Sequence, residues 1–409
     1  MKLTDLPTAS FCILPWVSAA VDPQGHVVPC CLCMGDQADD YAKEHHVRLP
    51  AIDNGIVNAR NSFLFKKIRE QMIAGEKPSI CKVCWNNEAK FIDNSNIVEF
   101  QRIGQHHAYA DKDVTEYKNE LLPLKFLETG ISNLCNFACV MCNKGASSII
   151  YAAFHPGEKI PKGFHKDNEN IDDDLSELTR VKIVGGEPMI EKKHDKLLEK
   201  IVNQNINPSQ LVLEYHTNAS VFPSQRVIDC WKKISKVRII FSMDGVEEES
   251  TLQRPGNYKW EDVEATVDKY IQLANTGVPI VFSANIVLTA LNIDHITDTC
   301  EWLYNKLKHS NTSWFYCNPI PVQDSFTYID FRNLSKITKQ RIKNKWKEWE
   351  INSPLILAHD ISMIYQIAKK HIDEKGTLVT PLTAELMLEK HPNARLWKMF
   401  DEDLSRLNI

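Results

Sequence analysis

Cys135-Asn-Phe-Ala-Cys139-Val-Met-Cys142 is the stretch of this 409-residue chain that decides its fold. Three thiols at C-x3-C-x2-C spacing on one short loop can hold an iron–sulfur cluster and leave one iron without a protein ligand. A zinc site is the alternative at this spacing, because thiolates bind zinc as readily as iron. Residues 124–132, directly before the loop, are largely apolar and predict a buried strand. The thiols are therefore expected at the carboxyl end of a strand.

A second predicted strand ends in a different polar motif. Residues 181–188 read Val-Lys-Ile-Val-Gly185-Gly186-Glu187-Pro188. The glycine pair permits close approach of the backbone to a ligand, because glycine has no side chain. The carboxylate that follows can accept hydrogen bonds from an ammonium group. This motif predicts a ligand-binding strand end near the cysteine loop.

Together the two strand ends resemble the radical S-adenosylmethionine (SAM) superfamily. The resemblance implies that Cys135, Cys139 and Cys142 bind a 4Fe-4S cluster. It also implies that the amino and carboxylate groups of SAM chelate the open iron, and that the strand end Gly185–Pro188 contacts the amino group. Met141 is a departure, because the residue before the third cysteine is commonly aromatic in this family. Methionine is a flexible apolar substitute there.

Further strands and helices are predicted after the first two strands. Segments rich in β-branched or aromatic residues predict four more strands, over residues 210–219, 236–245, 278–288 and 312–320. Apolar stripes at helical spacing lie between them, within residues 190–202, 227–234 and 263–271. Six strand–helix units indicate an α/β fold with a parallel sheet. By the resemblance, the expected fold is a partial (β/α)6, TIM-like radical SAM barrel.

Polar side chains follow several of the predicted strands. Ligands gather at the carboxyl ends of the strands in barrels of this kind, although Asn, Asp and Ser also begin ordinary turns. The resemblance implies that Ser242 contacts the SAM ribose and that Arg254 pairs with the SAM carboxylate. A planar guanidinium fork suits that pairing. Asn218, Asp244 and Asn285 are expected in the same cofactor or substrate pocket.

The N-terminal hundred residues carry a second set of cysteines. A hairpin is predicted around the turn Asp22-Pro-Gln-Gly25 and ends at Pro29-Cys30-Cys31. A helix predicted over residues 63–74 leads to a C-x2-C pair. Cys31 is the alternative to Cys30 as a ligand, and a zinc site is possible at this spacing. The hairpin and the helix bring together four thiols, those of Cys12, Cys30, Cys81 and Cys84.

The spacing Cys12-x12-Gly25-x4-Cys30 followed by C-x2-C resembles the Twitch module, which is the shorter form of the SPASM domain. The resemblance implies a second, auxiliary 4Fe-4S cluster with four thiolate ligands. In the family this module usually follows the barrel, whereas here it precedes it. Chain ends usually lie at the surface, so a module can sit beside the barrel from either terminus.

The expected organisation has four parts. Residues 1–100 form a small α+β, Twitch/SPASM-like module, residues 101–123 a linker, residues 124–325 the barrel, and residues 326–409 a helical C-terminal extension. Residues 150–175 are expected to form a long insertion, either over the active face or on the surface.

Composition sets further expectations. No apolar segment follows a basic start, so a cytoplasmic location with twelve reduced cysteines is expected. Apolar runs fall short of the length that spans a membrane. The net charge of −5 comes without the basic stripe that nucleic-acid binding requires, so neither membrane nor nucleic acid is an expected partner.

By the resemblance, an electron from the reduced cluster cleaves SAM to methionine and a 5′-deoxyadenosyl radical, which abstracts hydrogen from a substrate. The electron is expected from an external donor such as flavodoxin or ferredoxin, and the auxiliary cluster is expected to accept the substrate electron. The expected substrate is a peptide or protein side chain, with a small molecule such as a sugar or cofactor precursor as the alternative. A noncatalytic electron carrier or redox sensor is a further alternative. Arg254 and Gly-Gly-Glu-Pro argue against it, because a carrier needs no nucleotide pocket.

Overall fold

The structure is a computed structural model of the whole chain. It describes residues 6–22, 24–91, 102–110, 119–130, 132–142, 145–158, 171, 174–254, 258–308, 315–321, 329–353 and 359–374. The strands are β1 Ser18–Val21, β2 Val27–Val28, β3 Phe126–Gly130, β4 Arg180–Val184, β5 Val212–Thr217, β6 Lys236–Ser242, β7 Ile280–Leu288 and β8 Phe315–Pro321. The helices are α1 Leu14–Val17, α2 Asp36–Glu44, α3 Ile56–Arg60, α4 Phe63–Ile73, α5 Lys82–Phe91, α6 Arg102–Tyr109, α7 Ser148–Phe154, α8 Lys193–Gln204, α9 Gln225–Trp231, α10 Glu247–Gln253, α11 Trp260–Asn275, α12 Ile296–Leu307, α13 Lys336–Asn352 and α14 His359–His371.

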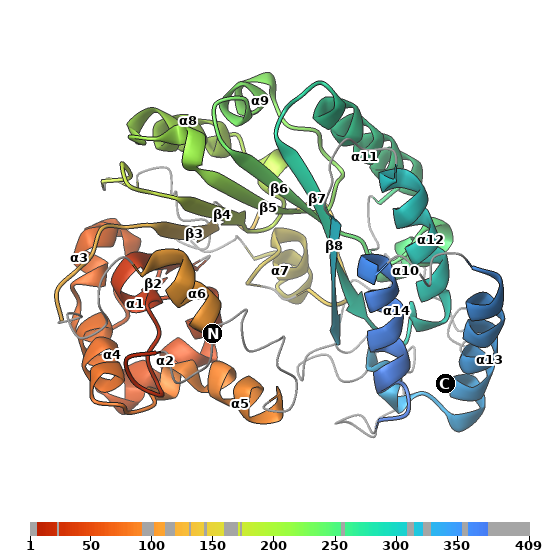
Figure 1. Cartoon of the computed structure of the whole chain (residues 1–409), viewed down its shortest axis with the longest axis horizontal. Coiled ribbons are helices and arrows are strands. Elements are labelled where there is room, and N and C mark those ends of the chain that lie inside the picture. Colours follow the sequence, from red (N-terminus) through yellow and green to blue (C-terminus); the bar gives the residue numbers. More distant parts are fainter. Residues whose placement is uncertain are drawn as a thin grey trace.

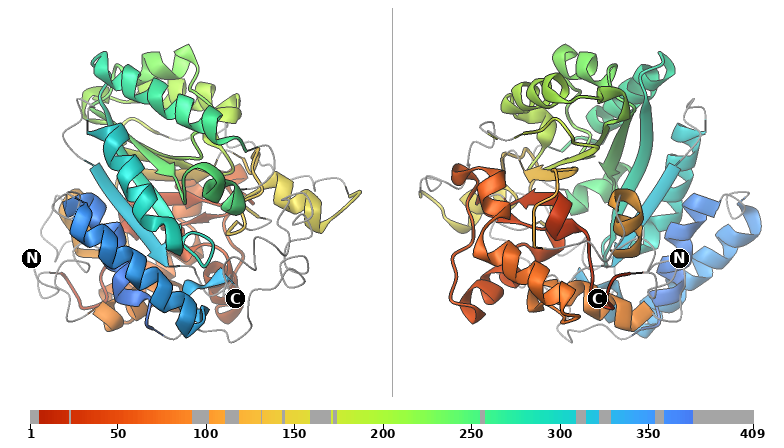
Figure 2. Two further views of the ribbon diagram at one scale, coloured as in Figure 1. Left: turned by 90° about the vertical axis from the view of Figure 1, so that its right-hand side faces the viewer. Right: turned by 60° about the vertical axis from the view of Figure 1, so that its left-hand side comes forward.

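One eight-stranded sheet organises the chain, in the order β2-β1-β3-β4-β5-β6-β7-β8. Strands β3 to β8 are parallel to one another. The sheet curves, with α8, α9, α11 and α12 on its outer side (Figure 1). The N-terminal helices lie beside one end of the sheet, and α13 and α14 lie beside the other (Figures 1 and 2). The fold is a partial barrel, as the sequence predicts.

Strands β3 to β8 are the six strands expected from the sequence, and α8, α9 and α11 are the helices expected between them. Helices of this kind form because their apolar side chains recur at helical spacing. In α8, for example, Leu197, Leu198, Ile201 and Val202 are all buried. Strand order follows chain order throughout the barrel. Because these strands are also parallel, the carboxyl ends of neighbouring strands meet at one edge of the sheet.

Alternate side chains divide the sheet into two faces. Outward side chains meet the helices: Tyr215 contacts Trp231 of α9, and Phe241 contacts Tyr270 of α11. The buried apolar side chains at these alternating positions are Leu127, Val181, Ile183, Leu213, Tyr215, Val237, Ile239 and Phe241. Burial of this face stabilises each strand against its covering helix.

The inner face instead carries a row of four charges in direct cross-strand register. We call Glu128, Lys182, Glu214 and Arg238 the luminal charge row. Lys182 Nζ lies 3.0 Å from Glu128 Oε1, and Arg238 Nη1 lies 3.0 Å from Glu214 Oε2. Arg180 Nη2 also donates to Glu214 Oε2, at 2.8 Å. Barrel interiors are usually filled by branched apolar side chains, so this polar layer departs from ordinary core packing.

The N-terminal hairpin joins this same sheet. Gly25 adopts a φ of 81°, and its N–H donates to Asp22 O at 2.9 Å, which closes the predicted turn. Strand β1 pairs antiparallel with β2 and parallel with β3, so the hairpin continues the barrel sheet. The region expected as a linker contains α6, whose Arg102 is buried. These contacts bind the N-terminal part to the barrel more closely than the sequence indicated.

The C-terminal part is helical over its described residues, as expected. Helix α14 packs against β8 and α12, and Trp346 of α13 packs edge-on against Tyr365 of α14. The apolar stretch at residues 384–388 lies outside the described residues. The expected insertion at 150–175 includes part of α7, and most of it beyond residue 158 also lies outside them.

In the described part of the chain, no helix combines the length and the apolar character needed to cross a membrane.

Candidate functional site

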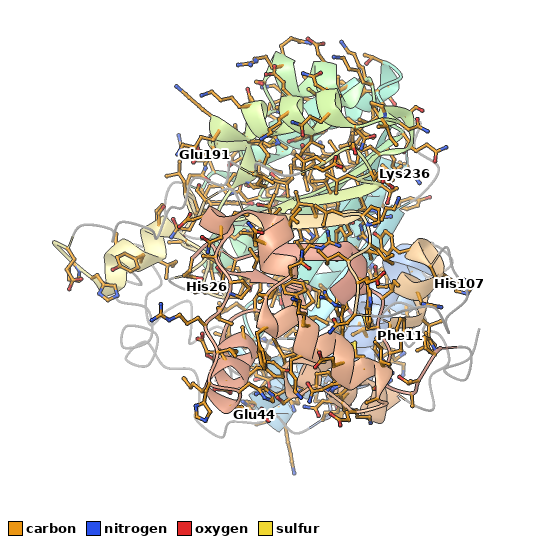
Figure 3. All side chains as sticks on the ribbon, turned by 90° about the vertical axis from the view of Figure 1, so that its left-hand side faces the viewer. Phe11, His26, Glu44, His107, Glu191 and Lys236 are labelled. Atoms are coloured by element: carbon orange, nitrogen blue, oxygen red, sulfur yellow. The ribbon has the colours of Figure 1, made fainter. Side chains whose placement is uncertain are left out.

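The cysteine loop lies at the carboxyl end of β3, where the sequence predicts it. In Figure 3, Glu191 after β4 and Lys236 at the start of β6 mark opposite ends of the strands, and α7 lies at the Glu191 end. The N–H of Cys135 donates to Ser148 Oγ of α7 at 3.2 Å. The N–H of Val140 donates to Gln253 O of α10 at 2.9 Å. Two helices thus fix the loop that carries the three thiols.

Gly186 lets the end of β4 approach this loop. A Cβ at Gly186 would lie 2.1 Å from Leu134 O and 2.7 Å from Asn133 C. The N–H groups of Gly186 and Glu187 donate to the carbonyls of Ser132 and Leu134 at 2.9 and 2.8 Å. Gly185 adopts a φ of 137°, a conformation that glycine tolerates best. Glycine is therefore required here because the end of β4 contacts the loop that follows β3.

The strand ends enclose a pocket of about 350 Å³. The sequence missed several wall residues, namely Phe137, Ala146, Val184, His216 and Val287. Met141, the departure from the family pattern, also lies on the wall. Ten residues predicted from the sequence line this pocket together: Cys135, Cys139, Cys142, Gly185, Gly186, Asn218, Ser242, Asp244, Arg254 and Asn285.

Glu187 and Pro188 are the predicted site residues that the described pocket wall does not include. Glu187 is 1% exposed, and its carboxylate accepts from Thr217 Oγ1 at 2.8 Å and from the N–H of Asn218 at 2.6 Å. Burial raises the pKa of Glu187 to about 7, although these hydrogen bonds oppose the shift. The carboxylate therefore ties the end of β4 to the end of β5. Glu187 is not among the described residues that line the pocket, and its contact with an ammonium group stays a prediction.

Arg254 is buried between a carboxylate and a thiol. Its Nη2 donates to Asp244 Oδ2 at 2.5 Å, and its Nη1 donates to Cys139 Sγ at 3.3 Å. Its Nε is buried and meets no hydrogen-bond partner among the described residues. Burial opposes the charge, but Asp244 and Cys139 raise the pKa of Arg254 above its ordinary value. The guanidinium therefore stays charged, on the wall of the pocket and beside the thiol triplet.

His216 is the pocket residue that sequence reasoning missed most clearly. Its Nδ1 lies 3.0 Å from Asn285 Nδ2, and its Nε2 lies 3.6 Å from Glu214 Oε1. Burial opposes ionisation of Glu214, but the nearby His216 ring and the charges of Arg180 and Lys182 lower the pKa of Glu214. His216 thus connects the pocket wall to the luminal charge row. The sequence did carry a sign of this connection, because the charged residues of these strands lie at alternating, inward positions.

A second cavity, of about 190 Å³, lies where the N-terminal part meets the start of the barrel sheet. Glu128 and Lys182 of the luminal charge row form part of its wall. Its other wall comes from the end of the hairpin, the short helix Ser79–Cys81 and the start of α5. Six thiols line it, those of Cys12, Cys30, Cys31, Cys33, Cys81 and Cys84.

The six thiols differ in their surroundings. Cys30 Sγ and Cys33 Sγ lie 3.7 Å apart, and this contact lowers the pKa of Cys30. Cys31 is turned toward Glu128 and Lys182; burial and the Glu128 charge raise the pKa of its thiol. Burial and the nearby thiols raise the pKa of Cys84 to about 12. Cys33 is buried in the cavity beside Cys30, a position that the sequence did not indicate.

Arg102 of α6 closes the second cavity. Its Nε and Nη2 donate to the two carboxylate oxygens of Glu88 at 2.7 Å each. Its guanidinium lies 4.5 Å from the ring centroid of Trp85, and its Nη1 donates to Ala9 O and Phe11 O. The residue expected in a linker is therefore part of the cavity wall.

The donor sets of both sites fit iron–sulfur clusters. Zinc draws four ligands around one ion at about 2.3 Å from sulfur, whereas a 4Fe-4S cluster takes one thiolate on each iron and spreads its ligands wider. Three thiols line the first pocket and six line the second cavity, and thiolates are the ligands that such clusters take. Burial and the neighbouring Cys139 raise the pKa of the Cys135 thiol to about 12, so binding of a cluster would release the thiol proton.

Comparison with known proteins extends this description. Residues 129–303 match the model of the radical SAM superfamily, and residues 12–85 match that of the SPASM iron-sulfur cluster-binding domain. No curated protein matches the chain.

Solved structures that match include native anSMEcpe with bound AdoMet, at 20% identity and a TM-score of 0.36 over 56% of this chain and 62% of that one. Native anSMEcpe with bound AdoMet and Cp18Cys peptide matches at 16% identity and a TM-score of 0.33, over 55% and 62%. The chain thus spans about three-fifths of the length of these structures. With its cysteine loop, its strand-end pocket and the two matching domain models, the chain carries a radical SAM domain over residues 129–303 and, ahead of it, a SPASM-type iron–sulfur cluster-binding domain over residues 12–85.

Proposed function

We propose that this protein reductively cleaves SAM and uses the resulting 5′-deoxyadenosyl radical to abstract hydrogen from a peptide or protein side chain. The observation that carries this proposal is the convergence of ten residues predicted for cluster and SAM binding on one pocket of about 350 Å³. They come from the cysteine loop, from or just after four further strands, and from the end of α10, so their meeting depends on the fold.

In this proposal the chain's own residues bind the cluster and SAM, and they orient SAM in the pocket. Cys135, Cys139 and Cys142 hold a 4Fe-4S cluster, which supplies the electron when SAM is bound. Arg254 and the backbone at Gly185 line the pocket and would bind the methionine end of SAM. Enclosure of the pocket by the strand ends keeps water from the reacting carbon.

The N-terminal thiols supply the second part of the proposal. Cys12, Cys30, Cys81 and Cys84 hold the auxiliary cluster, with Cys30 preferred to Cys31. This choice is supported by the interaction of Cys31 with Glu128 and Lys182. Bound there, the auxiliary cluster would supply an acceptor for the electron that the substrate loses, and an external one-electron donor such as flavodoxin or ferredoxin would supply the electron for the first cluster.

The choice of a peptide or protein substrate rests on the resemblance, because Twitch- and SPASM-bearing relatives modify ribosomal peptides or protein side chains. Other relatives oxidise sugars or build cofactors, so a small molecule is the second candidate. A simple electron carrier has no use for a charged guanidinium that lines a pocket beside the thiol triplet.

The test is anaerobic incubation of the reconstituted protein with dithionite and SAM, with 5′-deoxyadenosine measured by chromatography. Product from the native protein, and none from the Cys135→Ala/Cys139→Ala/Cys142→Ala variant, is the expected result. A Cys230→Ala variant, which changes a buried thiol of α9 outside both sites, serves as the matched control. A fully iron-loaded protein that releases no 5′-deoxyadenosine, with or without candidate peptides, would contradict the proposal.

A further inference from the structure

Arg254 contacts a predicted cluster ligand directly. The distance from Nη1 to Cys139 Sγ is 3.3 Å, and both residues are largely buried, at 8% and 9% exposure. The resemblance assigns Arg254 to the SAM carboxylate, a role that requires SAM to be present. The contact with Cys139 joins Arg254 to the cluster-binding loop itself, a role distinct from the one toward SAM.

A network holds the guanidinium in this position. Asp244 accepts from Arg254 through Oδ2 and from the N–H of Val287 through Oδ1, at 2.5 and 2.7 Å. Gln253 Nε2 donates to Asp244 O at 3.0 Å, and Gln253 O accepts from the N–H of Val140 in the cysteine loop. The carboxylate, the guanidinium and the thiol loop are therefore fixed relative to one another by strand β7 and helix α10.

We propose that Arg254 sets the reduction potential of the SAM-binding cluster through a charge-assisted N–H···S hydrogen bond to Cys139, and that Asp244 limits this effect. The inference rests on the proposed 4Fe-4S cluster at Cys135, Cys139 and Cys142.

The physical reason is the charge balance of the site. Reduction adds one electron to the cluster, and a fixed cation beside a ligand sulfur stabilises the reduced form more than the oxidised form. Hydrogen bonds to cluster sulfurs and burial are the main means by which a protein adjusts such potentials. The effect is large where water is excluded, because the local dielectric screens charge weakly. The negative charge of Asp244, in contact with the same guanidinium, acts in the opposite direction.

Opposite shifts are therefore expected from the two partners. Arg254→Gln removes the cation and should move the midpoint potential of the SAM-binding cluster to more negative values. Asp244→Asn removes the opposing charge and should move it to more positive values. Arg254→Lys keeps the charge without the fork and should shift the potential less than Arg254→Gln. Arg226→Gln, which changes an exposed ion pair on α9, should leave the potential unchanged.

The experiment is a redox titration followed by electron paramagnetic resonance, without SAM. The Cys81→Ala/Cys84→Ala background leaves one cluster signal to follow. If this background does not fold, the titration is made on the complete protein, and the signal missing from the triple-cysteine variant identifies the cluster. Affinity for SAM is measured on the same variants.

Three results separate the possibilities. A negative shift for Arg254→Gln with a positive shift for Asp244→Asn supports the inference. An unchanged potential in Arg254→Gln, with weaker SAM binding alone, overturns it and leaves Arg254 only its role toward SAM. Absence of any 4Fe-4S signal from the parent protein after reconstitution would instead contradict the proposed function on which the inference rests.

Discussion

Replacing Gly186 with Ala should break the contact between β4 and the cysteine loop. The new Cβ would lie 2.1 Å from Leu134 O and 2.5 Å from Leu134 C. Both are backbone atoms, so no side-chain rotation can relieve the overlap, and the loop must move away from the strand. That movement breaks the hydrogen bonds from the N–H groups of Gly186 and Glu187, each of which contributes about 1 kcal/mol.

The size of the effect follows from these contacts. Overpacking at a rigid contact costs about 1–3 kcal/mol, so together with the lost hydrogen bonds the free energy of unfolding should fall by about 3–5 kcal/mol. Chemical denaturation of the iron-free protein, followed by circular dichroism, measures this loss. The displaced loop should also lower the iron bound at Cys135, Cys139 and Cys142 after reconstitution.

Gly130 offers a matched control in the neighbouring strand. A Cβ there would lie no closer than 3.8 Å to another heavy atom, an ordinary van der Waals distance. Gly130→Ala should therefore change stability by less than about 1 kcal/mol and keep the iron content. The reasoning fails if Gly186→Ala unfolds at the same denaturant concentration as the native protein and binds the same amount of iron.

Three further outcomes are expected. Cys81→Ala/Cys84→Ala should lower iron and sulfide by roughly half, because one of two 4Fe-4S clusters is lost, and should leave cleavage of SAM to 5′-deoxyadenosine intact; complete loss of iron would contradict two independent sites. Glu214→Gln should destabilise the protein by about 3–5 kcal/mol, since two guanidinium groups lose their buried carboxylate. The folded state lowers the pKa of Glu214, so its contribution is complete above about pH 4.5 and is lost at lower pH, a dependence that denaturation curves of the variant should lack. Burial lowers the pKa of His194 from 6.5 to about 4, so the native protein should lose about 3 kcal/mol as pH falls across that interval, and His194→Gln should show a flatter profile.

Much of the barrel was predictable because its signals are local. A buried parallel strand is a short apolar run, and six such runs alternated with amphipathic helices. The motifs at the strand ends then indicated which edge of the sheet carries the pocket. Nine of the ten predicted residues meet there because parallel strands place their carboxyl ends together, and the tenth, Arg254, is brought there by α10.

What the sequence did not indicate depends on pairing between distant segments. The partner of β1 is β3, and no local pattern specifies that choice. Likewise the Glu187 carboxylate is of a type that often binds ligands, but here it is buried and accepts hydrogen bonds from Thr217 and Asn218. Arg102 lay in a polar segment that read as a linker, and its role emerges only from its contacts with Glu88 and Trp85.

The pairing of β1 with β3 also bears on how this protein is made. About a hundred residues separate the end of β1 at Val21 from the start of β3 at Phe126. During synthesis β1 therefore cannot pair with β3 until β3 has been made, and such non-local strand pairing is slow to form. A barrel excised at residue 124 would present the bare edge of β3, a template for pairing between molecules. The cluster-binding region thus acts as the edge protection of the barrel, and exchanging or removing it should produce aggregation before it produces an altered enzyme.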